Sequence, residues 1–262
     1  MPITPLDVLK KLWEQRDLLQ KGWLSLQRTI KSGKTVIAVF GPGGVGKTTF
    51  GVYLSPDFDP ARIAKQYEES PGIEEQWLKL DSAQKIWIAP GQETSRIEKT
   101  WPLLNQKLTR AKRKAIIVFV VSYGYHTPRP DRTITDWNAY IIEKRTEELR
   151  FLERVVSYFE QTPTSDLRFL TLVTKEDIWW PEHDTVIAHY EQGEYKKLID
   201  RLFSQKGRDN FHHEFAYLSL RHENLKNASE STIAFPTAAG YEDTLFYSHQ
   251  ERAMSILKEL LK

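Results

Sequence analysis

Apolar residues follow two different spacings along this chain, and their alternation predicts the order of its elements. Continuous apolar runs, typical of strands buried on both faces, predict strands at Val36–Phe40, Ala115–Val121, Arg168–Val173 and Phe215–Leu220. Apolar positions three or four residues apart predict helices at Thr135–Gln161, at His183–Leu202 with an interruption near Gly193, and at Ser248–Leu261. Strands that alternate with helices favour an α/β fold, a three-layer α/β/α sandwich with a mostly parallel central sheet.

Two further elements flank this alternation. Residues Thr4–Lys31 carry apolar side chains at alternating spacings of three and four, which predicts an amphipathic helix. Gln76–Leu80 and Lys85–Ala89 alternate as strands do and are joined by a turn, so we expect a hairpin there. The chain therefore divides into an N-terminal amphipathic helix, residues 1–34, and one α/β domain, residues 35–262.

The segment directly after Val36–Phe40 carries the strongest chemical signal in the chain. It reads Gly41-Pro42-Gly43-Gly44-Val45-Gly46-Lys47-Thr48, the glycine-rich loop and helix start of a P-loop. Glycines let several backbone N–H groups approach phosphate oxygens, and the following helix adds the partial positive charge of its N-terminus. Lys47 is expected to reach the β- and γ-phosphates, and the Thr48 hydroxyl to bind Mg²⁺. The predicted nucleotide-binding residues of this motif are Gly41, Gly43, Gly44, Val45, Gly46, Lys47, Thr48 and Thr49.

Composition narrows the functional classes. The 262 residues include 37 Lys and Arg against 35 Asp and Glu, so no global positive field gathers nucleic acid, and we expect no nucleic-acid partner. There is no cysteine, which excludes a disulfide framework and Cys-ligated zinc and fits a reducing compartment. The longest strongly apolar run, Ala115–Val121, is too short to span a bilayer, and charges interrupt the N-terminal segment. We therefore expect a cytoplasmic protein and no contact with a membrane surface.

Two later motifs follow strands that the pattern places in the same sheet. Gly91-Gln92-Glu93 follows the second strand of the expected hairpin, and Thr174-Lys175-Glu176-Asp177 follows Arg168–Val173. In a doubly wound sheet, these motifs and the P-loop lie together at the carboxyl ends of the strands. In their order and approximate spacing, the three motifs resemble those of Ras-like small GTPases, over about residues 35–225.

The resemblance implies a guanine-nucleotide site with GTP or GDP and Mg²⁺ as cofactors. Asp177 is then expected to accept hydrogen bonds from N1–H and the 2-amino group of guanine, an edge that adenine does not present. Lys175 lays its aliphatic stem along the base. Thr174 stands where the family usually has Asn, so one structural hydrogen bond is altered and a lower nucleotide affinity is expected. Ser219-Leu220-Arg221 stands where the family has Ser-Ala-Lys, which places Ser219 and Leu220 at the guanine oxygen.

For catalysis, the resemblance implies that Gln92 orients the attacking water, that the Gly91 amide senses the γ-phosphate and that Lys47 acts on that phosphate as a point charge. This sequence departs from the family's pattern at two places that concern Mg²⁺ binding. Ile88 stands where the family has an acidic residue that holds Mg²⁺ through water. No Thr occurs between Gly51 and Leu80, which leaves Ser70 as the nearest hydroxyl substitute. The expected metal ligands are thus Thr48 and Ser70, and we expect GTP hydrolysis to be slow or absent.

Three functions remain open on the sequence alone. A GTP-binding switch that hydrolyses GTP slowly and signals through a protein partner accounts for all three motifs. A P-loop ATPase shares the glycine-rich loop but leaves Thr174–Asp177 unexplained, and a pseudo-GTPase scaffold that binds nucleotide without turnover accounts for Ile88. An effector or regulator protein would contact the parts of the chain beyond a minimal domain, which are the helix at residues 4–31 and the loop at residues 122–134.

Overall fold

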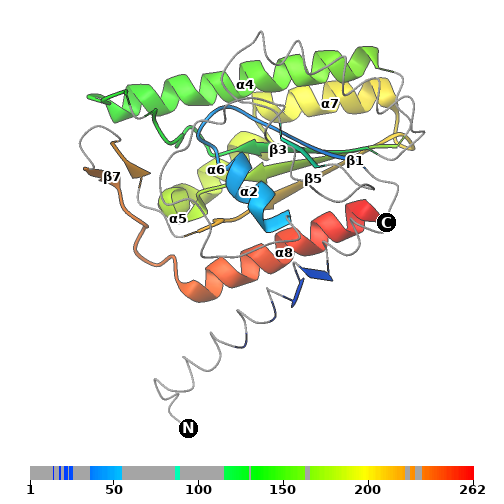
Figure 1. Ribbon diagram of the computed structural model, residues 1–262. Helices are drawn as coiled ribbons and strands as arrows, with labels where there is room; N and C mark the ends of the chain where they lie inside the picture. The colour runs from blue at the N-terminus through cyan, green and yellow to red at the C-terminus, as the bar shows by residue number, and fades with distance from the viewer. Residues whose placement is uncertain are drawn as a thin grey trace.

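A parallel five-stranded sheet forms the middle layer of the protein (Figure 1). The computed structural model describes residues 14, 18, 21–22, 24–25, 36–54, 86–88, 115–129, 131–162, 166–221, 225–227 and 232–262. The strands of this sheet are β1 (Val36–Phe40), β2 (Ile86–Ile88), β3 (Ala115–Val121), β4 (Leu167–Val173) and β5 (Phe211–Tyr217). They lie in the order β2-β1-β3-β4-β5, and each pair of neighbours is parallel. The predicted α/β fold with a parallel central sheet is confirmed.

Helices cover both faces of this sheet (Figure 1). One face carries α4 (Trp137–Gln161), α5 (Glu176–Trp179), α6 (His183–Glu191) and α7 (Glu194–Lys206), and the other carries α2 (Lys47–Leu54) and α8 (Asp243–Leu261). A 3-10 turn, η2 (Trp180–Glu182), joins α5 to α6. Alternate residues of β1 pack into the two cores. Ala38 and Phe40 lie on the α4 side, and Ile37 and Val39 lie on the α8 side. The result is three layers with a core on each side of the sheet.

The last strand of the sheet lies earlier in the chain than its apolar pattern predicts. Phe215–Leu220 is the expected strand, whereas β5 spans Phe211–Tyr217. Because β5 is at the edge of the sheet, its first half alternates buried with exposed positions and does not form an apolar run. The backbone N–H of Leu218 donates one further hydrogen bond to Val173 O (3.0 Å), after which the chain leaves the sheet. Ser219 and Leu220 consequently lie in a loop beyond the strand end.

The predicted hairpin falls mostly outside the described residues. Ile86–Ile88 forms β2, which pairs in parallel with β1 and places Ile86 opposite Ile37. Its expected partner, Gln76–Leu80, lies outside the described residues. Helix α8 begins at Asp243 rather than at the predicted Ser248, and its first turn carries an acidic residue, Asp243, that suits a helix N-terminus.

Two short segments lie outside the three layers. The strands β6 (Leu225–Lys226) and β7 (Ile233–Phe235) pair antiparallel between β5 and α8, and the apolar pattern does not predict them. The six described residues of the predicted helix Thr4–Lys31 are helical. Gly22 lies against α8, since a Cβ added to it would be 3.0 Å from the Met254 Cε atom. The division of the chain at residue 34 stays a prediction.

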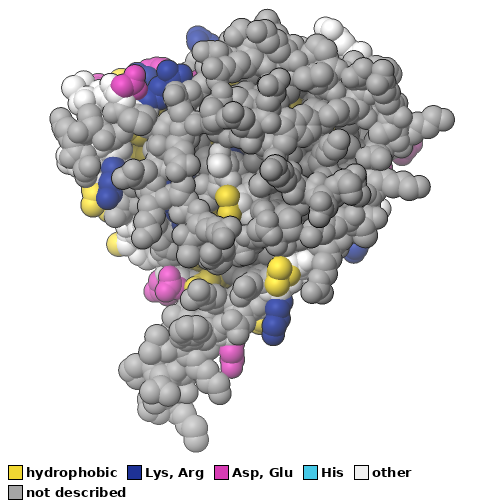
Figure 2. Space-filling model, in the orientation of Figure 1, with side chains coloured by type: hydrophobic (Ala, Val, Ile, Leu, Met, Phe, Trp, Pro, Cys, Tyr) yellow, Lys and Arg dark blue, Asp and Glu magenta, His cyan; other side chains and the backbone are white. Residues whose placement is uncertain are grey.

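The described helices include no membrane span, and described charges of both signs occur on the face in Figure 2. Among the residues that the structure describes, no helix combines the length and the apolar character that crossing a membrane requires. On the face in Figure 2, the described basic and acidic side chains are interspersed.

Candidate functional site

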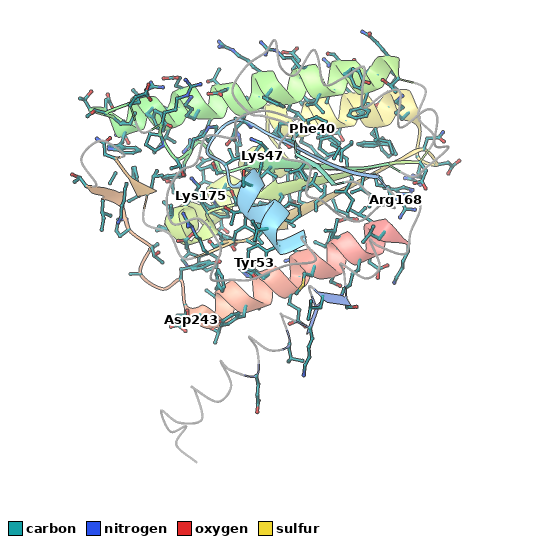
Figure 3. All side chains as sticks on the ribbon, viewed as in Figure 1. Phe40, Lys47, Tyr53, Arg168, Lys175 and Asp243 are labelled. Atoms are coloured by element: carbon teal, nitrogen blue, oxygen red, sulfur yellow. The ribbon has the colours of Figure 1, made fainter. Side chains whose placement is uncertain are left out.

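The P-loop leaves β1 where the strand order of the sheet reverses. Strands β2 and β3 lie on opposite sides of β1, so the carboxyl end of β1 is a topological switch point, the place where doubly wound sheets bind ligands. Figure 3 shows Lys47 and Lys175 at this end of the sheet and Arg168, near the start of β4, at the other end. The topology thus brings the first and third sequence motifs together.

Glycines in the P-loop adopt a backbone that other residues reach only with strain. Gly44 has φ +76° and Gly46 has φ +97°. The loop after β3 approaches Gly44 closely, since the N–H of Thr127 donates to Gly44 O (3.0 Å) and a Cβ on Gly44 would lie 2.4 Å from Thr127 O. Gly44 therefore serves both the turn of the P-loop and its close packing against a second loop.

Lys47 is buried at the start of α2. Its ammonium donates to Pro42 O (2.5 Å) and so folds back over the P-loop. Burial lowers the pKa of Lys47 to about 7, and the attraction of Glu147 only partly opposes this shift. A phosphate bound at the loop would supply the negative charge that this ammonium lacks.

Thr174 ties the base motif to the P-loop. Its hydroxyl lies 2.6 Å from Val45 O and 3.0 Å from Val121 O, and its single proton is shared between these two carbonyls. The indole N–H of Trp179 in turn donates to Thr174 O (2.8 Å). The hydroxyl therefore links the P-loop and strand β3 to the motif that follows β4, although Asn is absent from this position.

Asp177 and Ser219 come from different parts of the chain and meet in the structure. The backbone N–H of Asp177 donates to Ser219 Oγ (2.7 Å), and the Ser219 hydroxyl donates to Asp177 Oδ1 (2.5 Å). Both residues are fully buried. Leu220 follows at the P-loop, where its Cδ1 atom is 3.3 Å from the position that a Cβ on Gly46 would take. The P-loop, the motif that follows β4 and the Ser219–Leu220 loop therefore adjoin in the structure.

Lys175 has a left-handed backbone, with φ 61°, at the N-terminus of α5. Its ammonium donates to Tyr125 O (2.7 Å) and to the Thr127 hydroxyl (2.8 Å). Burial lowers the pKa of Lys175 to about 7, against the raising effect of Asp177. A non-glycine residue in this conformation costs about 1–2 kcal/mol, so the surrounding contacts hold it in place.

The loop after β3 is organised by Glu148, a fully buried residue of α4 that the sequence reasoning missed. Glu148 Oε1 accepts from the N–H groups of Ser122 (2.9 Å) and Gly124 (3.2 Å) and from His126 Nε2 (2.8 Å), and Oε2 accepts from the Tyr190 hydroxyl (2.8 Å). Burial alone would raise the pKa of Glu148, but these donors lower it below its usual value. A charged residue among the buried positions of a helix was the available signal.

This network changes the interpretation of residues 122–134 as a partner-binding loop. Its first part, Ser122–His126, is buried, and Tyr125 and Thr127 hold Lys175. Arg129 and the residues 131–133 are exposed. Only this outer part of the loop can therefore meet another protein without rearrangement.

Thr237 is a second residue that sequence reasoning missed. Its hydroxyl donates to Asp177 Oδ2 (3.0 Å) from the chain between β7 and α8. Sixty positions separate the two residues, and nothing in the local sequence around Thr237 indicates the contact.

The remaining predicted site residues fall into two groups, one outside the described residues and one within them. Gly91, Gln92 and Ser70 lie outside the described residues. Gly43 and Thr49 are half-buried and Thr48 is exposed at the start of α2, and Ile88 belongs to β2. Within the described part of the chain, no group of three or more His, Asp or Glu side chains could hold a metal ion.

The chain was compared with known proteins. No protein-family model matches it, and no curated protein does. Among solved structures, it is similar to an ADP-ribosylation factor-like GTP-binding protein, the small COPII coat GTPase SAR1 from Encephalitozoon cuniculi in complex with GDP, with a TM-score of 0.43 and 12% identity over 97% of this chain and 94% of that one. It is also similar to a chain of the signal recognition particle receptor SRb-GTP/SRX complex from Chaetomium thermophilum, with a TM-score of 0.42 and 14% identity over 72% of this chain and 92% of that one. At these scores the argument for function rests on the site itself.

Proposed function

We propose that this chain is a guanine-nucleotide-binding switch that binds GTP and GDP, hydrolyses GTP slowly and signals through a protein partner. One observation carries the proposal: the motif that contains the buried carboxylate of Asp177 is joined to the P-loop by the hydrogen bond from the Thr174 hydroxyl to Val45 O. The proposed phosphate-binding and base-reading groups thus lie on adjoining segments at the switch point of the sheet.

The nucleotide fits the chemistry of these residues. The P-loop offers backbone N–H groups, the N-terminus of α2 and the Lys47 ammonium to a polyphosphate. The Asp177 carboxylate offers acceptors to the N1–H and 2-amino donors of guanine, whereas adenine presents an acceptor at N1 and leaves the carboxylate unsatisfied. A site built around buried polar groups discriminates strongly against a ligand that leaves them unpaired.

Magnesium is part of the proposal with a reduced set of protein ligands. The Thr48 hydroxyl at the start of α2 suits Mg²⁺, which is bound by few protein groups together with phosphate and water oxygens. Ile88 offers no oxygen at the position of the family's acidic residue. Because phosphoryl transfer depends on positioned charge, we infer slow turnover, and a scaffold that binds nucleotide without turnover is the second candidate that Ile88 favours.

The signalling part of the proposal concerns the exposed surface near the site. Arg129 and residues 131–133 are exposed. In the same loop Thr127 contacts both Gly44 and Lys175, and Tyr125 contacts Lys175. A change at the phosphates therefore has a short path to a surface on which an effector or regulator could bind. The helix at residues 4–31 is the other candidate surface.

Calorimetric titration of the nucleotide-free protein tests the proposal. GTP, GDP and ATP are each added with Mg²⁺ and with chelator. We expect binding of GTP and GDP only, strengthened by Mg²⁺. Guanine binding indifferent to Mg²⁺ together with no phosphate release would favour the scaffold, and a preference for ATP would refute the assignment.

Asp177→Asn supplies a sharper test because it predicts a gain as well as a loss. An amide can donate to the 2-oxo group of xanthine but clashes with the 2-amino donor of guanine. We expect the variant to lose GDP binding and to gain XDP binding at an unchanged thermal midpoint. Lys47→Ala is the companion variant, which should lose binding of both diphosphates. An Asp177→Asn variant that still prefers GDP would remove Asp177 from the base site.

A further inference from the structure

The chain from residue 232 to the start of α8, which includes β7, lies over the base motif. This cover segment, residues 232–242, makes three contacts with two consecutive residues of α5. The Thr237 hydroxyl donates to Asp177 Oδ2 (3.0 Å), the Ala238 N–H donates to Asp177 O (2.7 Å), and the Tyr241 hydroxyl donates to Glu176 Oε2 (3.2 Å). Both oxygens of the Asp177 carboxylate thereby have a hydroxyl donor, Ser219 on one and Thr237 on the other.

Asp177 is 0% exposed with the cover segment in this position. A guanine base cannot place two donors on a carboxylate that no water-sized probe reaches. Ser219 belongs to the loop that adjoins the P-loop, but Thr237 belongs to a segment outside the three layers. Of the two hydroxyl donors, Thr237 is the one that can leave without disturbing the sheet or the P-loop.

Much of the cover segment is exposed. Ile233 is 49% exposed, Pro236, Ala239 and Gly240 are exposed, and a Cβ on Gly240 would meet nothing within 4 Å. Besides the bonds of Thr237 and Ala238 to Asp177, its contacts lie nearer its ends, where Phe235 packs on Tyr125 (ring centroids 5.2 Å apart) and Tyr241 packs on Trp180 (5.5 Å). Segments with few buried contacts open locally at low cost, so the middle of the segment can move while its ends stay attached.

We propose that Thr237 controls access of the guanine base to Asp177, and that nucleotide binds only after its hydroxyl has left the carboxylate. This proposal rests on the proposed guanine site. Guanine replaces one hydroxyl donor with two nitrogen donors, so the exchange of partners favours the bound state once the segment has opened. Because only molecules with an open segment bind nucleotide, the apparent Kd is the Kd of the open form divided by the fraction of molecules that are open.

Thr237→Val tests the proposal because valine keeps the shape of threonine and removes the donor. A hydrogen bond to a charged group, when lost, shifts such an equilibrium by about tenfold or more. We expect the association rate of N-methylanthraniloyl-GDP, measured by stopped flow, to rise about tenfold, its dissociation rate to stay unchanged and its Kd to fall by the same factor. Tyr241→Phe removes the second hydroxyl contact and should act in the same direction. A merely destabilising substitution would weaken binding instead.

Thr146→Val is the matched control. Its hydroxyl bonds Ile142 O (3.0 Å) on the exposed side of α4, away from the cover segment. We expect neither the association rate nor the Kd to change in this variant. If Thr237→Val raises the dissociation rate and weakens binding, Thr237 supports the bound carboxylate and the access role is wrong. An unchanged association rate contradicts the role as well.

Hydrogen exchange in the nucleotide-free protein separates this proposal from the proposed function. The Ala238 amide is bonded to Asp177 O in the closed state, so Thr237→Val should raise its exchange rate by about the same tenfold factor. If this exchange rate does not change, the cover proposal fails whatever the protein binds. If it rises while the wild-type protein binds no guanine nucleotide, the proposed function fails and the cover segment closes over a site for a different ligand.

Discussion

As pH rises above 7, we expect deprotonation of Lys47 to weaken nucleotide binding and to stabilise the free protein. Burial lowers the pKa of Lys47 to about 7. A polyphosphate at the P-loop would place negative charge beside the ammonium and raise that pKa toward its ordinary value of 10.5. Below pH 7 the lysine is protonated in the free and the bound protein, so affinity is constant. Above pH 7 binding must take up a proton, and affinity falls.

The magnitude follows from linkage. Well above pH 7, each pH unit costs a factor of about ten in Kd, or about 1.4 kcal/mol. Because Lys47 is already about half deprotonated at pH 7, about sixteenfold is lost between pH 7 and pH 8.5. For the free protein the unfolded chain has the higher lysine pKa. The destabilisation is therefore complete below pH 7 and is relieved as pH rises from 7 toward 10.5. In this window the free protein becomes more stable while its nucleotide affinity declines.

Titration of GDP at pH 7.0, 7.7 and 8.5 in two buffers of different ionisation enthalpy measures both the Kd and the protons taken up. The second pKa of a phosphate monoester is about 6, so the terminal phosphate is nearly fully ionised throughout this range. Lys175→Met is the control, because it removes the other buried lysine of the site and should retain the uptake at Lys47. A Kd that is constant across this range, with no buffer-dependent heat, would refute the buried, charge-deficient Lys47 that the structure describes.

Two further predictions concern the hydrogen bonds that hold the site. Thr174→Val removes the donor to Val45 O, and it should lower the free energy of unfolding in urea by about 1–2 kcal/mol and weaken GDP binding. The control is Thr162→Val, which removes a hydroxyl that bonds Tyr158 O away from the site and should leave GDP binding unchanged. Equal GDP affinities in the two variants would contradict the link between the motifs. Tyr190→Phe leaves Glu148 Oε2 and the Tyr123 N–H without the hydroxyl and should cost about 2–3 kcal/mol in the free energy of unfolding. Tyr217→Phe, which loses an exposed contact to Glu191, should stay within about 0.5 kcal/mol. A loss in Tyr190→Phe as small as that in Tyr217→Phe would show that the Glu148 network adds no stability.

The features predictable from the sequence were those set by local pattern. The runs Val36–Phe40 and Ala115–Val121 form β1 and β3 with the predicted boundaries, because a strand buried on both faces must be apolar throughout. The break near Gly193 separates α6 from α7, since a Cβ there would lie 2.5 Å from His189 O. The half-exposed strand β5 was misplaced because an edge strand carries no continuous run.

The residues of the candidate site likewise divide into those that a local sequence pattern indicates and those that it does not. Thr174, Lys175 and Asp177 were found because they follow a buried strand, and parallel strands bring their carboxyl ends to one edge. Glu148 and Thr237 were missed because each reaches its partners across a distance in sequence that no local pattern encodes. Gly91, Gln92 and Ser70 lie outside the described residues and stay predictions.

By itself the sequence determined the kind of site, because a glycine-rich loop between an apolar strand and a helix can be recognised from residue types and short spacings. Only the tertiary structure decided what surrounds that site: the Glu148 network that holds the neighbouring loop and the cover segment whose Thr237 caps Asp177. The physical reason is that backbone conformation depends on neighbouring residues, whereas the pairing of buried polar groups depends on which segments the folded chain brings into contact.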